Sequence, residues 1–333
     1  MSRPKGLRGR GLHDLGMNIN LVDQMLAPFR VFWVDPANGS DQRTGRNLDE
    51  ALASLPAAHD RCTAGLNDVV ALVGDGGTAA SARLTETLIW SKNATHLIGV
   101  AAPSYNPRAR IATLSGAAAF ANFIRVTASG CRFQNFSIFN DNAIAAQITW
   151  DDRGGRNYYE NVLFGGIGDV TSAASTTSRV LRLGGSGASG ENWFKHCTIG
   201  IDTIGRSVAN ASLEFIGTNP SKRNVFEDCL FTIKASATTA LTILSSGVNP
   251  LESFQLFKNC TFHNSYPQYS ALLQAAVATL AANGNGRLVM DNCRRYGVTD
   301  WGTDSTSLAQ IYVAGSVLGA GDDVGQSAAA IAS

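Results

Sequence analysis

One pattern of hydrophobic and polar positions recurs along most of the chain. It opens on an aromatic residue, has Asn, His or Asp third and Cys or another apolar residue fourth, and closes on an apolar residue. Successive copies begin 26 to 35 residues apart, the length of one coil of a β-solenoid. The pattern therefore predicts an all-β fold, a right-handed parallel β-helix. Its six copies are Phe133–Ile138, Tyr159–Phe164, Phe194–Ile199, Phe226–Phe231, Phe257–Phe262 and Met290–Arg295.

The third motif position predicts a corner in the backbone. Side chains of a straight strand alternate between its faces, so the apolar first and fourth positions could not both be buried. They can be if the chain turns at the third position, and Asn, Asp and His tolerate the left-handed conformation that such a turn needs. We therefore expect a stacked polar ladder at this corner. Its members are Asn135, Asn161, His196, Asp228, Asn259 and Asn292.

The other motif positions predict stacked columns. The first position forms an aromatic column in the core, and the fourth places four of the six cysteines there: Cys197, Cys229, Cys260 and Cys293. We interpret these as free, buried thiols that pack as small hydrophobes, with a metal or nucleophilic role as the alternative. The second position faces solvent and alternates in sign from Glu160 onward, which predicts a ladder of opposite charges. That row is Gln134, Glu160, Lys195, Glu227, Lys258 and Asp291.

Further elements can be placed between and before the motifs. A short helix is expected around Leu48–Leu55 and a last strand at Leu308–Val313. A second strand in each coil is predicted at Ile144–Trp150, Arg179–Leu183, Leu213–Ile216, Leu241–Leu244 and Ala271–Leu273. The predicted organisation is an N-terminal arm (1–30), a single β-helix domain (31–313, with strand and cap helix in 31–60 and coils in 61–313) and an Ala/Gly/Ser-rich tail (314–333).

Composition and charge narrow the function classes. The 333 residues include 34 Gly and only 16% charged residues, with a net charge of +1, so no global field favours nucleic acid or a membrane surface. No apolar run is long enough to span a bilayer, and the N-terminus lacks the apolar core of a signal peptide. Six cysteines without a CxxC pair or zinc-ligand spacing predict neither a disulfide scaffold nor a metal site. We expect no cofactor, no direct nucleic-acid partner and no membrane association.

The first ten residues are a local exception to the balanced charge. They contain Arg3, Lys5, Arg8 and Arg10 and no acid. One interpretation is an arm that docks on an acidic partner surface, and the alternative is a flexible tail.

The start of the predicted domain resembles a known family. The segment Val31-Phe-Trp-Val-Asp-Pro-Ala-Asn-Gly-Ser-Asp41, a strand running into Gly74-Asp-Gly-Gly77 and the strand Thr95-His-Leu-Ile-Gly99 resemble the opening of pectate-lyase-like right-handed β-helices. With the repeat, the resemblance covers about Val31 to Tyr296. It implies the fold, which is also found in phage virion structural proteins. It implies an activity less directly, since enzymes of this fold cleave polysaccharides with a calcium-binding acidic cluster beside an Arg base, or with two carboxylates.

One group of acids was considered as a catalytic site. It consists of Asp141, Asp151, Asp152 and Asp169, with Arg153 and Arg156 nearby in a Gly-containing turn, where charged residues are ordinarily only solvated. The histidines are scattered: His13, His59, His96, His196 and His263. No segment matches a catalytic motif of the family, so no catalytic residue is assigned from the resemblance.

Three functions remain open at this point. The first is a non-enzymatic structural protein, in particular a phage capsid decoration (cement) protein, made in the host cytoplasm and located on the capsid surface of the virion. Its expected partners are the major capsid protein and further copies of itself, with a trimer as one possible assembly. The second is a tailspike or fibre that acts on a surface polysaccharide. The third is a free polysaccharide lyase or hydrolase.

Overall fold

The computed structural model describes residues 30–74, 81–114, 120, 122–140, 147–187, 189–265, 274–282 and 286–314. The predicted N-terminal arm up to residue 29, with its four basic residues, and the predicted tail from residue 315 lie outside the described residues.

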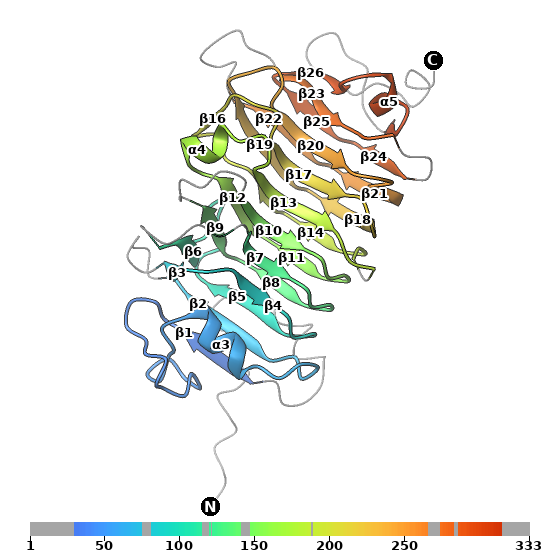
Figure 1. The fold of residues 1–333 in the computed structure, drawn as a ribbon. Helices are drawn as coiled ribbons and strands as arrows, with labels where there is room; N and C mark the ends of the chain where they lie inside the picture. The colour runs from blue at the N-terminus through green and yellow to red at the C-terminus, as the bar shows by residue number, and fades with distance from the viewer. Residues whose placement is uncertain are drawn as a thin grey trace, which may run out of the picture.

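The chain folds as a right-handed parallel β-helix, as predicted, and three parallel sheets line the solenoid along its described length (Figure 1). Sheet A consists of β1 (Val31–Val34), β2 (Val69–Val73), β5 (His96–Val100), β8 (Arg132–Gln134), β11 (Tyr158–Glu160), β14 (Trp193–Lys195), β18 (Lys222–Glu227), β21 (Glu252–Lys258), β24 (Arg287–Asp291) and β27 (Ile311–Ala314).

Sheet B follows each corner, and sheet C closes each coil. Sheet B consists of β3 (Ala82–Leu84), β6 (Arg110–Thr113), β9 (Ser137–Asn140), β12 (Leu163–Ile167), β15 (Thr198–Ile199), β19 (Leu230–Ala235), β22 (Thr261–Asn264) and β25 (Arg294–Tyr296), with β16 (Gly205–Arg206) beside β19. Sheet C consists of β4 (Leu88–Trp90), β7 (Asn122–Val126), β10 (Ile148–Asp152), β13 (Arg179–Gly184), β17 (Ala211–Ile216), β20 (Leu241–Ser246), β23 (Gln274–Thr279) and β26 (Val298–Gly302).

Each copy of the motif supplies two strands, one on either side of its corner. All six residues at the third position have positive φ, between 50° and 58°. Their side chains bond along the column: Asn161 Nδ2 donates to Asn135 Oδ1 at 2.7 Å, and Asn292 Nδ2 donates to Asn259 Oδ1 at 2.8 Å. Their backbone N–H groups continue the pairing, as when Asp228 N donates to Lys258 O at 3.0 Å. The corner is thus fixed by local conformation and by bonds between coils.

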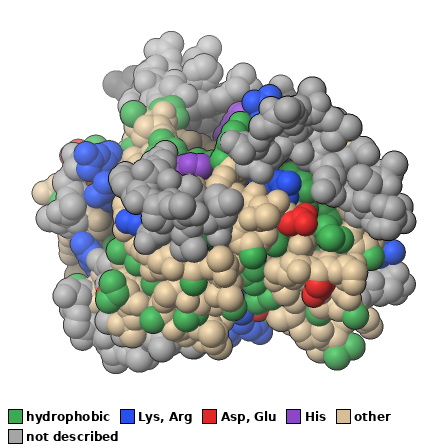
Figure 2. Space-filling model, turned by 90° about the horizontal axis from the view of Figure 1, so that it is seen from above, with side chains coloured by type: hydrophobic (Ala, Val, Ile, Leu, Met, Phe, Trp, Pro, Cys, Tyr) green, Lys and Arg blue, Asp and Glu red, His purple; other side chains and the backbone are tan. Residues whose placement is uncertain are grey.

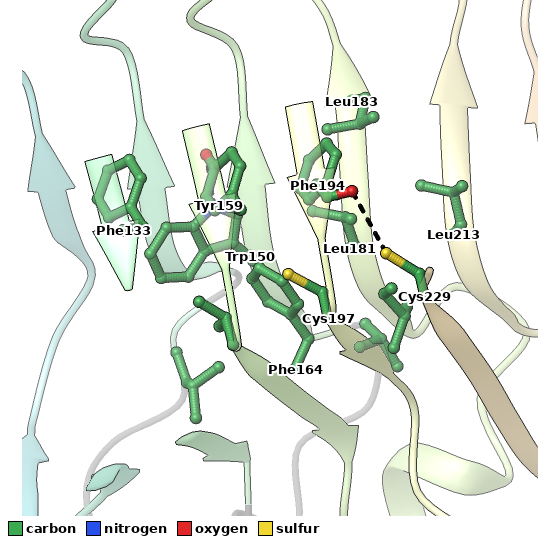
Figure 3. Packing of buried hydrophobic residues seen from close by; sticks show 14 of the residues in the cluster. Phe133, Trp150, Tyr159, Phe164, Leu181, Leu183, Phe194, Cys197, Leu213 and Cys229 are labelled. Carbon is green, nitrogen blue, oxygen red and sulfur yellow. Dashed lines mark hydrogen bonds between the residues drawn. The ribbon is translucent and has the colours of Figure 1, made fainter. Parts of the chain in front are cut away.

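Stacked aromatic rings fill the core beside this corner. Consecutive rings from Phe133 to Phe257 are nearly parallel, with centroids 4.4 to 4.9 Å apart and interplanar angles of 4° to 13°. Trp150 from sheet C packs edge-on against this column, as Figure 3 shows. The spacing of the rings equals the strand spacing of a β-sheet, so the column grows by one ring per coil.

The six cysteines are free and buried. The thiols of Cys229, Cys260 and Cys293 each donate to a carbonyl of the preceding coil, as Cys229 Sγ does to Phe194 O at 3.4 Å (Figure 3). Burial raises the pKa of the Cys62 thiol to about 12 and that of Cys131 to about 11. These thiols therefore stay protonated at neutral pH, a form that is a poor nucleophile.

Charges on the outer surface follow the predicted alternation. Lys258 Nζ lies 3.2 Å from Glu227 Oε1, and Glu160, Lys195 and Glu227 are paired in register on neighbouring strands. Seen from above in Figure 2, basic and acidic side chains stand in small separate groups among hydrophobic and polar atoms.

No described helix is long and apolar enough to cross a membrane.

A second polar ladder, which the sequence analysis missed, lies at the corner between sheets C and A. Its members are almost completely buried, and each side-chain oxygen accepts the backbone N–H of the preceding coil. Asn157 Oδ1 accepts from Cys131 N at 2.9 Å, and Asn192 Oδ1 accepts from Asn157 N at 2.9 Å. The ladder continues through Asn224 and Gln255. It satisfies backbone donors that the turn would otherwise leave unpaired.

Several predicted boundaries were wrong. The cap helix is α3 (Leu55–Arg61) and not Leu48–Leu55, because Ser54 accepts from Ala57 N as N-cap and Pro56 occupies the first turn. The last strand is β27, preceded by α5 (Ser305–Leu308), which Asp304 caps. Strand β10 begins at Ile148, and 271–273 lie outside the described residues.

Hydrogen bonds of Lys92 connect the cap helix to the coil that follows it. Lys92 Nζ donates to the carbonyls of His59 and Asp60 at 2.7 Å and of Cys62 at 2.9 Å. These carbonyls belong to the C-terminal end of α3, where a helix leaves acceptors unpaired and favours a positive charge.

The corner conformation gives a first prediction. Replacing Asn259 by Ala should lower the free energy of unfolding by roughly 2–3 kcal/mol, since it introduces left-handed strain and removes the ladder bonds. Asn259→Gly removes the same bonds without the strain and should cost less. Urea unfolding of both variants checks this order. An equal loss in the two variants would show that conformation at the corner is unimportant.

The ring column gives a second prediction. Phe226 is completely buried between Phe194 and Phe257, so Phe226→Ala should cost about 3–5 kcal/mol. Phe254→Ala is the matched control, because that side chain is 41% exposed and its loss should cost under about 1 kcal/mol. Thermal and urea unfolding measure both. Similar losses for the two variants would contradict the assignment of the column as core.

Candidate functional site

The outer face of sheet C brings together charged residues from successive coils. Arg125 on β7, Asp151 on β10, Arg182 on β13 and Glu214 on β17 are paired in register, so their side chains stack along one row. Arg153, just beyond β10, reaches the same carboxylate. We call Asp151, Arg125, Arg153 and Arg182 the Asp151 cluster.

Three guanidinium groups hold the carboxylate of Asp151, which is completely buried. Arg125 Nε lies 3.1 Å and Arg153 Nε 2.9 Å from Oδ2, while Arg182 bonds both oxygens at 2.9 Å. The arginine side chains are 16% to 30% exposed, so the charges sit at the surface above the buried carboxylate. Three positive groups against one negative group leave a local net charge of +2.

The electrostatics keep Asp151 ionised. Burial alone would raise its pKa, but hydrogen bonds and charge from Arg182 and Arg153 outweigh that effect and hold the pKa below its ordinary value. A carboxylate in this state has no proton to donate as a general acid. Both of its oxygens also accept bonds from arginine, which leaves it badly placed to act as a base or a nucleophile.

Asp152 is the next residue on β10 and points to the other side of the sheet, into the core. Its Oδ2 accepts from Tyr159 Oη at 2.7 Å, and its Oδ1 accepts from Gly154 N at 2.8 Å. Complete burial raises its pKa to about 6 against these hydrogen bonds. Asp151 and Asp152 therefore lie on opposite faces and do not form an acid–base pair.

The other described members of the predicted group, Arg156 and Asp169, lie apart from these two. Arg156 pairs with Glu191 at 2.8 Å on the turn before sheet A. Asp169 caps the short helix α4 (Val170–Ala173), where its Oδ1 accepts from Thr171 N. Asp141 lies outside the described residues.

Two further groups extend the outer row and were missed from sequence. Arg179 Nε lies 3.1 Å from Glu214 Oε1. Arg206 is buried and bonds Asn210 Oδ1 at 2.6 Å and Ser212 Oγ at 2.8 Å, and burial lowers its pKa to about 9. Aligning the sheet C strands as a second repeat would have revealed the alternation of Arg125, Asp151, Arg182 and Glu214.

His59 and His96 are poor candidates for a catalytic base. Burial lowers the pKa of His59 and of His96 to about 4, so both rings are neutral at pH 7. His196 stands in the corner ladder, 3.5 Å from Asp228. Within the described part of the chain, no group of three or more His, Cys, Asp or Glu residues is arranged to hold a metal ion.

A pocket of about 460 Å³ lies between α3 and strands β3 and β4. Its wall includes His59, Asp60, Glu86 and Ile89. Ile89 is paired in register with Arg125, so the pocket lies next to the row of the Asp151 cluster.

Comparison with known proteins shows similarity of fold. No protein-family model and no curated protein matches the sequence. A pectin methylesterase from Erwinia chrysanthemi aligns over 92% of this chain and 95% of its own, with 11% identity and a TM-score of 0.57. A pectate lyase aligns over 91% and 74%, with 13% identity and a TM-score of 0.53. A protein described as Geobacillus virus E2 ORF18 aligns over 90% and 57%, with 13% identity and a TM-score of 0.46. The chain has the pectate-lyase-like β-helix fold.

The buried carboxyl of Asp152 gives a third prediction. Its folded-state pKa of about 6 exceeds the ordinary value of 3.8, so it favours folding below pH 4, and this contribution is lost as the pH rises through 6. The stability of the wild type relative to Asp152→Asn should therefore fall by about 3 kcal/mol between pH 4 and pH 8. Urea unfolding across this range measures the difference, with the exposed Asp202→Asn as the control for loss of one carboxylate. A pH-independent difference would contradict the raised pKa.

Proposed function

We propose that the protein is a non-enzymatic structural protein, and more specifically a capsid decoration protein of a phage. The observation that supports this most directly is the burial, ionisation and hydrogen bonding of Asp151, which was a candidate catalytic carboxylate in the sequence. Asp151 is completely buried, ionised and bound by three arginines. A residue held in this way stabilises an outer sheet face. It has no proton to donate, and arginines bond both of its oxygens, which disfavours a role in bond cleavage.

Other conspicuous side chains of the solenoid also have architectural roles. The asparagines form two ladders, the cysteines are free residues buried in the core, and Asp169 and Asp304 cap short helices. Such a body is stiff, because every coil is hydrogen-bonded to its neighbours along three sheets. Stiffness suits a protein that reinforces a larger shell.

In this proposal the body binds the major capsid protein on the outside of the virion, after synthesis in the host cytoplasm. The basic residues Arg3, Lys5, Arg8 and Arg10 are the proposed docking contacts, since four positive charges within ten residues suit an acidic patch of the shell. Arg30, the first described residue, pairs with Asp68.

The decoration proposal gives a fourth prediction. The full chain, incubated with expanded empty capsids of the phage that contains its gene, should co-sediment with them and raise their rupture temperature. A variant lacking residues 1–29 retains the Arg30–Asp68 pair and should bind at least ten-fold more weakly. Replacing Arg3, Lys5, Arg8 and Arg10 by Gln should weaken binding similarly, whereas Gln at the exposed body residues Arg43, Arg46, Arg108 and Arg294 should not.

The same experiment can overturn the proposal. Absence of both binding and capsid stabilisation would reject a decoration role. Full binding by the chain lacking residues 1–29 would reject the arm as the docking element while leaving the decoration role in place.

A second candidate function is the binding or modification of an acidic polysaccharide. The net charge of +2 at the Asp151 cluster favours it, together with the folds shared with a pectin methylesterase and a pectate lyase. Incubation with methylesterified pectin and with polygalacturonate separates the candidates. Release of methanol or of unsaturated oligosaccharides, lost in Arg182→Ala, would support this second function over the first.

A further inference from the structure

The outer face of sheet A contains a continuous apolar stripe. Six residues, one from each of six neighbouring strands, are paired in register along it. Trp193 and Tyr312 are 44% and 43% exposed, and the other four are partly exposed. We call this row the outer stripe: Tyr158, Trp193, Val225, Leu256, Val289 and Tyr312. A contiguous apolar row on a solvent-facing sheet marks an interaction surface.

The described helices do not pack on this stripe. Helix α3 packs on β1 and β2 at the N-terminal end, α4 lies beside β16 and α5 beside β26 (Figure 1). The aromatic ends of the stripe are held in place from within the chain. The Arg132 guanidinium lies 5.3 Å from the Tyr158 ring centroid, and Arg287 Nε donates to Tyr312 Oη at 3.3 Å. A surface ordered in advance loses little side-chain entropy when it is covered.

Charges border the stripe on both sides, with opposite signs at four of its six levels. On the side of the polar corner lie Glu160, Lys195, Glu227, Lys258 and Asp291, each two residues after its stripe residue. On the opposite side, two residues before the stripe, lie Arg156, Glu191, Arg223, Phe254 and Arg287. Four of the five levels thus combine an acid on one border with a base on the other. At the level of Leu256, the exposed ring of Phe254 stands opposite Lys258.

This arrangement is complementary to itself. A two-fold axis along the stripe, parallel to the solenoid, superposes each border of one protomer on the opposite border of its partner at the same level. Glu160 then meets Arg156 of the partner subunit, and Lys195 meets Glu191 of the partner subunit. Phe254 meets Lys258 of the partner subunit, which suits a cation over a ring face. A different protein would have no reason to match this alternation.

We propose that the outer stripe is the interface of a parallel two-fold dimer of this chain. Six strands at about 4.8 Å and a width of about 20 Å give an area of about 600 Å² per copy. The total of about 1,200 Å² is at the lower end of specific interfaces, so the dimer should dissociate in the micromolar range. The two-fold pairing favours a dimer over a trimer, which was one possible assembly from the sequence. It does not depend on capsid binding, since only one face of the solenoid is used.

Solution mass tests the association and gives a fifth prediction. Sedimentation velocity of the full chain from roughly 1 to 100 µM should show a shift from one to two monomer masses. Val225→Arg places charges at the centre of the stripe and should weaken association at least ten-fold. Val248→Arg is the matched control, because Val248 is 75% exposed and lies outside the stripe. Unchanged thermal unfolding of both variants shows that the fold is intact.

Cysteine cross-linking tests the orientation. Tyr158→Cys and Tyr312→Cys, made separately, should each form a covalent dimer on mild oxidation, because each residue faces itself across the proposed axis. The native thiols are buried, so the wild type provides the blank. If neither single variant cross-links and only the double variant does, the copies are antiparallel and the proposed axis is wrong, since the two positions lie about 24 Å apart within one chain. A monomer at all concentrations would overturn the interface itself.

Discussion

The left-handed residue at the third motif position is the constraint on which the rest of the structure depends. A positive φ at this residue turns the chain so that the aromatic residue before it and the small residue after it both face the core. The same turn sends the following strand into sheet B, at an angle to sheet A. Asn, Asp and His tolerate this conformation and also form hydrogen bonds along the column. The same side chains therefore allow the backbone to turn and hold neighbouring coils together.

In-register stacking then determines which side chains of neighbouring coils lie next to each other at every other position of the motif. Once the corners are aligned, the rings from Phe133 to Phe257 must stack, the thiols must meet carbonyls of the preceding coil, and the outer charges must become nearest neighbours. The same rule acts on sheet C, where Arg125, Asp151 and Arg182 come together from three different coils. A cluster that resembles a reactive site in the sequence can thus arise from register alone, and its hydrogen bonds decide whether its groups are available for chemistry.

The fold and the motif columns could be predicted from sequence because each depends on short, local spacing. The helix at the N-terminal end was misplaced by nearly two turns, since the apolar residues from Leu48 onward resemble a helix while Ser54 and Pro56 fix where it begins. The Asp151 cluster was only partly anticipated. Asp151 and Arg153 are adjacent in sequence, but Arg125 and Arg182 reach them only through the register of sheet C, and the opposite orientation of Asp152 depends on where β10 begins. The ladder of Asn157, Asn192 and Asn224 was missed although each member stands two residues before the aromatic residue of its motif copy. Extending the motif by two positions towards the N-terminus would have revealed it.

The bonds of Lys92 have a consequence for how such a solenoid comes apart. A stack of coils whose terminal coil contacts one neighbour would be expected to fray from its ends, one coil at a time, exposing strand edges to proteases and to other chains. Here the ammonium group of one coil binds three carbonyls at the end of the cap helix. The cap cannot leave without exposing those acceptors and the lysine at once, so the cap helix and the coil of Lys92 should open together and not one after the other.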